Sequence, residues 1–269
     1  MTVKMFVTDL DGTLLNKEHR ISAENKKAVQ EAVAAGVVVT IATGRMYESA
    51  LPYAKELEVD VPIITYNGAL IRSVGGRDYY SSYLEAADCQ DILTYCREQD
   101  WYVQIYSDGV LYFAEETPEA EAYEAAAGIR GKAVGRDGLY EHCEHAPKML
   151  VIFRDASRTD GAVEQLQRAF AGRITAVKSD PNYIEIIRPG VNKASALHQL
   201  AELLQISPEE TMAIGDSNND LPMLKAAGHS VAMGNAGEHV QKITDYVTDT
   251  CDADGVAVAI RRYVLGTEG

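Results

Sequence analysis

Short apolar runs alternate with amphipathic segments in two separate parts of this chain. From the N-terminus, the pattern predicts strands at residues 4–8, 37–42 and 62–66, with helices at about 22–36 and 47–57 between them. This alternation is typical of a parallel sheet with helices on both faces. It returns after residue 190, where the pattern predicts four helices and three strands up to residue 265. We therefore expect a doubly wound α/β core that comprises residues 1–82 and 189–269.

The intervening residues, 83–188, follow a different pattern. Helices are predicted at 86–99, 118–127 and 157–170, and strands flank the turn at 108–109 and the turn at 180–182, with another strand at 149–154. Helices and strands do not alternate regularly here, and this lack of alternation is typical of an α+β domain. We expect this segment to be an α+β domain inserted into the core.

The net charge of the chain limits the classes of partner that we expect it to bind. Twenty-five Lys and Arg stand against 40 Asp and Glu, which gives a formal net charge of −15. A field of this sign repels phosphate backbones and anionic lipid head groups, so nucleic acid and membrane surfaces are not expected as partners. An anionic substrate would need a local cation or a bound metal.

Cysteine usage and hydropathy point to a cytoplasmic protein with reduced thiols. The sequence contains no CxxC pair, and we expect no signal peptide, because its first residues do not form a basic stretch followed by an apolar one. The longest apolar stretch, residues 33–42, is too short to cross about 30 Å of hydrocarbon. The chain has four cysteines: Cys89, Cys96, Cys143 and Cys251.

Two carboxylates stand at the end of the first predicted strand. Asp9 and Asp11 are two residues apart, so they point to the same side of an extended chain, and Gly12 lets the chain turn away. Like charges this close resist joint ionisation unless a cation lies near or one pKa is raised. An ordinary Asp-Gly turn explains the pair equally well.

A hydroxyl, a glycine and a cation follow the second predicted strand at Thr43-Gly44-Arg45, and Lys193 begins the helix after the insert. The tripeptide could simply cap a helix, and the lysine could be a solvated charge. However, a cation is disfavoured at a helix N-terminus, so the place of Lys193 favours a functional role.

Acidic residues also follow the strand predicted at 211–214. Asp216 is expected at the strand tip, with Asp220 on a helical face above it. Hard oxygen ligands of this kind suit Mg²⁺, although helix capping would also favour Asp here. Ligands of open α/β sheets bind at the carboxyl ends of the strands, and all of these segments are predicted to meet there.

Together these segments resemble the four motifs of the haloacid dehalogenase (HAD) superfamily. Other segments resemble the Cof-like subfamily with a type IIB cap, at residues 67–69, 233–236 and 254–257, together with the long insert before the lysine. Ala194 departs from the glycine that this subfamily usually has after the lysine. The four motifs are Asp9-Leu10-Asp11-Gly12-Thr13-Leu14, Thr43-Gly44-Arg45, Lys193 and Gly215-Asp216-Ser217-Asn218-Asn219-Asp220.

The resemblance implies a role for each matching residue. Asp9 would attack phosphorus to form an aspartyl-phosphate, and Asp11 would protonate the leaving group and then activate water. Mg²⁺ would be held by Asp9, the backbone carbonyl of Asp11, Asp216 and, in support, Asp220. The residues expected to bind phosphate or substrate are Leu10, Thr43, Gly44, Arg45, Asn67, Lys193 and Asn219.

These expectations favour a Mg²⁺-dependent phosphatase acting on a small phosphorylated metabolite, with sugar phosphates as the leading class. A sugar phosphomutase would use the same chemistry, and a receiver-like phospho-acceptor module is a non-enzymatic alternative that has no need of the long insert. Nine of the 15 tyrosines and the single tryptophan fall between residues 79 and 140. They could line a site for a ring-bearing substrate or belong to the core. The oligomeric state stays open.

Overall fold

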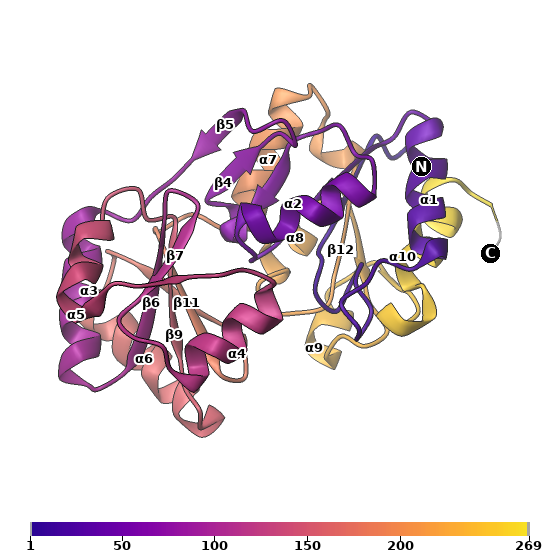
Figure 1. Cartoon of the computed structure of the whole chain (residues 1–269). Coiled ribbons are helices and arrows are strands. Elements are labelled where there is room, and N and C mark those ends of the chain that lie inside the picture. Colours follow the sequence, from indigo (N-terminus) through magenta and orange to yellow (C-terminus); the bar gives the residue numbers. More distant parts are fainter. Residues whose placement is uncertain (1, 268–269) are drawn as a thin grey trace. The chain divides into compact units, whose positions relative to one another are not determined.

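The computed structural model describes residues 2–267 and divides the chain into two compact units (Figure 1). The first unit contains the residues up to Gly44, Ala50–Tyr80 and the residues from Asn192 onward. The second contains Arg45–Ser49 and Ser81–Val191.

A five-stranded parallel sheet forms the centre of the first unit, in the order β14-β13-β12-β1-β2. All four residues of β1 are buried, because helices pack on the sheet and leave no face to solvent. The prediction of a doubly wound α/β fold is confirmed. The strands are β1 (Met5–Thr8), β2 (Val38–Ile41), β12 (Thr211–Gly215), β13 (His229–Ala232) and β14 (Tyr246–Val247).

The strand predicted at 62–66 lies in a separate three-stranded sheet, not in the main one. β3 (Ile63–Thr65) pairs antiparallel with β4 (Leu70–Arg72), which neighbours β5 (Asp78–Ser81). A single parallel bridge between Ala42 and Ile64 joins β3 to the end of β2. The strand expected as the third of the parallel sheet is thus β3, after which the chain reverses direction and forms β4.

Helices of the first unit follow the predicted order with shorter bounds. Ser22 caps α1 by accepting a hydrogen bond from the Asn25 amide, as expected. The helix predicted at 255–265 is instead a short α-helix, α10, that continues as a π-helical turn at Ile260–Val264. α1 packs against α10, and α7 packs against α8. The helices are α1 (Ala23–Ala34), α7 (Lys193–Leu203), α8 (Leu221–Ala226), α9 (Glu238–Gln241) and α10 (Gly255–Ala259), together with the part of α2 (Tyr47–Glu56) from Ala50 onward.

The second unit is built on a six-stranded sheet in the order β10-β11-β9-β6-β7-β8. Helices α3 (Ala86–Glu98) and α6 (Thr159–Ala169) contribute apolar side chains to its buried cluster, while α4 covers Pro118–Ala127. The short elements β8 and α5 (Gly135–Gly138) had not been predicted. The strands are β6 (Tyr102–Ser107), β7 (Val110–Phe113), β8 (Lys132–Ala133), β9 (Lys148–Ile152), β10 (Thr175–Asp180) and β11 (Tyr183–Ile187).

Two further features bear on the setting of the protein. Between residues 2 and 267, no helix combines the length and the apolar character needed to span a membrane. The four cysteines are all free thiols with buried side chains.

Candidate active site

Asp9 directly follows the central strand β1, and its side chain is almost completely buried. Its amide donates to the carbonyl of Ile214 over 3.1 Å, so Asp9 extends the pairing between β1 and β12. The chain then turns at Gly12, which has a φ of +71°. A Cβ there would lie 2.5 Å from Oδ2 of Asp216, so only glycine lets the turn pass this close to the second acidic segment.

Lys193 is the first residue of α7 and joins two carboxylates from distant parts of the chain. Its Nζ lies 2.7 Å from Oδ1 of Asp9 and 2.6 Å from Oδ1 of Asp220. The Lys193 and Asp220 side chains have no exposed surface. A buried lysine is rare unless it is paired, so these contacts explain how the charge is accommodated in the core.

The acidic segment after β12 forms a turn, and α8 begins only at Leu221. The prediction that Asp220 lies on a helical face is therefore wrong. Instead, its Oδ2 accepts hydrogen bonds from the amides of Asp216 and Ser217, over 3.1 and 3.0 Å. The carboxylate turns back toward its own strand because these two amides have no helical partner. Gly215 makes room for it, since a Cβ there would lie 2.5 Å from Cγ of Asp220.

Three carboxylates gather as a result. Oxygen atoms of Asp9, Asp216 and Asp220 all lie within 4.8 Å of one another. Burial raises the pKa of Asp9 well above its usual value, Lys193 opposes this, and the neighbouring carboxylates add to it. Burial and Asp220 also raise the pKa of Asp216, to about 6. One lysine therefore does not balance the negative charge of the cluster.

A divalent cation fits this cluster. Carboxylate oxygens are hard ligands, and Mg²⁺ takes one or two of them together with water and phosphate oxygens. Burial is the main cause of the raised pKa values of Asp9 and Asp216, the neighbouring carboxylates add to it, and a cation at the cluster would favour the ionised forms. Residues of the cluster are thus suited to hold a divalent metal.

Polar groups that directly follow β2 and β3 lie in the first unit, as the acidic cluster does. The amide of Asn67 donates to the carbonyl of Thr43 over 3.0 Å, and Nδ2 of Asn219 donates to Oδ1 of Asn67 over 3.1 Å. Nδ2 of Asn67 is buried without a hydrogen-bond partner. Gly44 is close-fitting here, since its Cβ would lie 3.0 Å from Oδ1 of Asn67. An unpaired buried donor is costly unless a ligand satisfies it, so Asn67 is suited to bind an anionic oxygen.

Three expected site residues lie outside this arrangement of side chains. The Asp11 carboxylate is not part of the acidic cluster; it is half-exposed, 3.6 Å from Nδ1 of His19. Leu10 is fully buried, so only its backbone is available to a ligand. Arg45 belongs to the second unit, where its Nη1 donates to Oγ of Ser49 over 3.1 Å.

Two supporting residues were not predicted. Oγ1 of Thr13 donates to Oδ1 of Asp216 over 3.1 Å. Nδ2 of Asn235 donates to the carbonyl of Gly12 over 2.8 Å, and its Oδ1 accepts from the Cys251 amide. Asn235 stands in the segment 233–236 that resembles the Cof-like subfamily, and this resemblance was the signal that could have identified it.

Comparison with known proteins agrees with this geometry. A family model for haloacid dehalogenase-like hydrolases matches residues 6–260. Phosphatase YwpJ of Bacillus subtilis (strain 168) is 31% identical, and the alignment covers 95% of this chain and 98% of that protein. From the same organism, 5-amino-6-(5-phospho-D-ribitylamino)uracil phosphatase YcsE is 34% identical, with 98% and 96% covered.

A solved structure extends the likeness to the whole fold. The crystal structure of TM0651 from Thermotoga maritima superposes with a TM-score of 0.85 at 32% identity, and 97% of each chain is covered. The family match, the relatives and the fold all agree. The chain therefore belongs to the haloacid dehalogenase-like hydrolases and, within them, to the Cof-like phosphatases.

Proposed function

We propose that this protein is a Mg²⁺-dependent phosphatase that hydrolyses a small phosphorylated metabolite, with sugar phosphates as the leading class. One observation carries the proposal: buried Lys193 contacts Asp9 and Asp220 while Asp216 lies within the same acidic cluster. This arrangement supplies a nucleophile, a fixed cation and metal ligands in one place.

Asp9 acts as the nucleophile. One of its carboxylate oxygens forms a bond to phosphorus as the bond from phosphorus to the leaving oxygen breaks, which gives an aspartyl-phosphate and the free alcohol. Lys193 supports this role because its charge lowers the pKa of Asp9 against the effect of burial. Burial still leaves the pKa of Asp9 raised, so a divalent cation bound at the cluster would further favour the ionised carboxylate that attacks phosphorus.

Asp11 acts as general acid and then as general base. It gives a proton to the leaving oxygen, and in the second step it takes a proton from the water that attacks phosphorus and releases Asp9. The exposed setting of its carboxylate, outside the acidic cluster, suits a group that must exchange protons with an alcohol and with water. A carboxylate bound to the metal would instead be held in place and ionised, and it could not exchange protons in this way.

The phosphoryl oxygens are held by Lys193, Thr43 and the paired amides of Asn67 and Asn219. The unpaired Nδ2 of Asn67 is the donor most in need of such an oxygen. Mg²⁺ bound by Asp9, Asp216, Asp220 and the backbone carbonyl of Asp11 would supply positive charge to offset that of the substrate and the transition state. These groups would stabilise the negative charge of the transition state without a conformational change of the protein.

The remaining parts of the proposal concern the substrate and its setting. Residues 83–188 form the cap domain that selects the leaving group, in the manner of a type IIB cap. Two relatives from Bacillus subtilis are named as 5-amino-6-(5-phospho-D-ribitylamino)uracil phosphatases, so this compound belongs among the candidate substrates. Four free thiols are in keeping with a reducing, cytoplasmic setting.

The test is phosphate release from p-nitrophenyl phosphate, a panel of sugar phosphates and the ribitylamino-uracil phosphate. Wild type and the Asp9→Asn variant are compared with Mg²⁺ and with EDTA. We expect turnover that requires Mg²⁺ and is lost in Asp9→Asn, because the amide cannot attack phosphorus. Lys225→Met, which changes an exposed side chain on α8, should keep the wild-type rate.

The outcome also separates the alternatives. Metal-dependent turnover by Asp9→Asn at the wild-type rate would refute the role of Asp9. Transfer of phosphate between positions of a sugar, without release, would identify a phosphomutase. A stable phosphorylated protein without turnover would favour the receiver-like module.

A further inference from the structure

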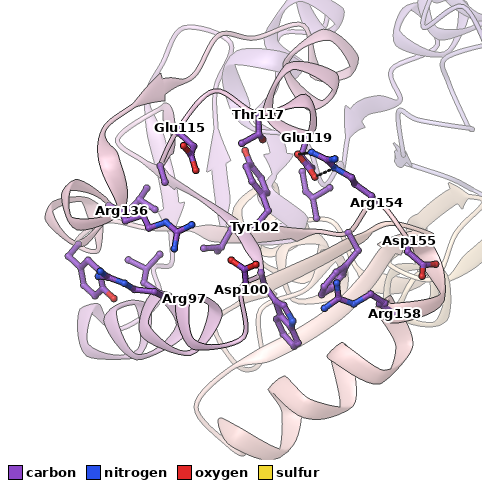
Figure 2. Close-up of a pocket in the computed structure, with 18 residues that line it drawn as sticks. Arg97, Asp100, Tyr102, Glu115, Thr117, Glu119, Arg136, Arg154, Asp155 and Arg158 are labelled. Carbon is purple, nitrogen blue, oxygen red and sulfur yellow. Dashed lines mark hydrogen bonds and ion pairs between the residues drawn. The ribbon is translucent and has the colours of Figure 1, made fainter.

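The second unit contains a cavity of about 370 Å³ whose lining residues all lie between residues 93 and 158 (Figure 2). This volume is within the range of sites that bind small organic molecules. None of the lining residues belongs to the acidic cluster or to the proposed phosphate-binding set. The cavity is therefore separate, in its residues, from the acidic cluster and from the proposed phosphate-binding set.

Aromatic and aliphatic side chains form the wall of the cavity. Trp101 and Phe153 meet edge to face, with ring centroids 5.2 Å apart, and both are largely buried. Leu93, Val103 and Leu139 continue the same apolar surface. Rings packed in this way present flat and edge surfaces that suit another aromatic ring.

Four arginines line the cavity, although the chain as a whole is strongly acidic. Two of them are already paired with carboxylates. Nη1 of Arg97 lies 3.0 Å from Oδ1 of Asp137, and Arg154 makes a two-pronged ion pair with Glu119. These two arginines are less available to a ligand.

The other two arginines are available. The guanidinium of Arg158 lies over the Phe153 ring, 4.9 Å from its centroid. Arg136 projects from α5 into the cavity in Figure 2, and within residues 2–267 no acidic side chain pairs with it. A guanidinium binds carboxylate, sulfonate or phosphate through two parallel hydrogen bonds and also stacks on aromatic rings.

Three exposed carboxylates, those of Asp100, Glu115 and Asp155, line the same cavity and make no ion pair there. They would accept hydrogen bonds from hydroxyl or amino groups of a ligand. They would also repel a ligand that is anionic at every edge. A ligand that suits the whole lining therefore has a ring, one acidic group and hydrogen-bond donors.

We propose that this cavity binds a small planar aromatic molecule that carries one acidic group. The ring contacts Trp101 and Phe153, and the acidic group is held by Arg136 and Arg158. This site is separate in its residues from the acidic cluster, so binding at the cavity does not depend on the proposed phosphatase mechanism.

The single tryptophan of the chain makes the test direct, because Trp101 lines the cavity. The probe is 8-anilinonaphthalene-1-sulfonate, an aromatic anion that accepts energy from excited tryptophan. We expect saturable one-to-one binding with loss of Trp101 emission. Arg136→Ala should weaken this binding by about 10-fold or more, since it removes a charged hydrogen-bond donor.

Three controls make the result specific. Arg168→Ala removes an exposed arginine of α6 that does not line the cavity, and it should leave probe binding unchanged. Removal of metal with EDTA should leave probe binding unchanged, because no lining residue belongs to the acidic cluster. Thioflavin T, an aromatic cation, should bind more weakly than the anionic probe.

The proposal is overturned if Arg136→Ala binds the probe as tightly as wild type, or if EDTA abolishes the binding. It is also overturned if the cation binds more tightly, or if Trp101 emission does not change. Circular dichroism of each variant, matched to that of wild type, confirms that a loss of binding does not come from unfolding.

Discussion

Replacement of Lys193 by Met would leave buried carboxylates without their cation. Met has a similar length and suits the buried position, but it cannot donate to Asp9 and Asp220, which Lys193 contacts at 2.7 and 2.6 Å. Loss of one partner from a buried ion pair costs about 3–5 kcal/mol. Because Lys193 serves two carboxylates, we expect the free energy of unfolding to fall by an amount in the upper part of this range, about 4–5 kcal/mol.

The pH dependence identifies the cause. Burial alone would lower the pKa of Lys193, but Asp220 and Asp9 more than offset this and raise it above 10.5. Lys193 is therefore charged in both the folded and the unfolded state near neutral pH, and its contribution is lost only as the pH rises through the raised value. In Lys193→Met, Asp9 loses the charge that lowers its pKa and takes up a proton more readily as the pH falls.

The assay is urea unfolding followed by circular dichroism, with EDTA present so that metal cannot compensate. Wild type, Lys193→Met and the exposed control Lys225→Met are compared at about pH 8 and about pH 5. We expect a large difference at the higher pH that narrows at the lower one, and no difference for the control. A loss below about 1 kcal/mol, or an equal loss at both pH values, would refute the electrostatic argument.

Three further outcomes are expected. Mg²⁺ should raise the melting temperature more at about pH 8 than at about pH 5, because protons compete for Asp216, whose pKa is raised to about 6; an equal rise at both would contradict this. Asn235→Ala removes an exposed hydrogen bond to the Gly12 carbonyl, so unfolding experiments should show a loss of about 0.5–1.5 kcal/mol and assays a lower rate of phosphate release. Gly68→Ala should be much more destabilising than Gly76→Ala in the same unfolding experiment, since both have positive φ but only Gly68 lacks space for a Cβ, 2.3 Å from a backbone oxygen.

Much of the core could be predicted from the apolar patterns typical of strands and of helices, together with the rule that the carboxyl ends of parallel strands meet at one edge of a sheet. Apolar runs marked β1 and β12 as buried strands, and the two strands are indeed parallel neighbours. The residues that follow them, Asp9 and Asp216, therefore lie close together. The contact of Lys193 with both Asp9 and Asp220 rests on side-chain reach, which a pattern of strands does not specify.

Other features depend on interactions that periodicity does not contain. Asp220 was expected on a helix, but its carboxylate instead satisfies two free amides of the preceding turn. β3 pairs antiparallel with β4 because the chain reverses at Tyr66–Gly68, where all three residues have positive φ. α5 is too short to show a helical repeat. The cavity of the second unit draws its lining from several elements, so its existence follows only from their packing.

The position of β1 in the main sheet has a consequence for biosynthesis. Within this sheet β1 is synthesised before the other strands, yet one of its two neighbours, β12, begins at Thr211. The second unit ends at Val191, so all of its residues are synthesised before the central sheet can close. We expect that in a fragment ending at Val191 the second unit resists protease while the N-terminal strand is cleaved. The strand of this sheet that is synthesised first would then be among the last to become protected.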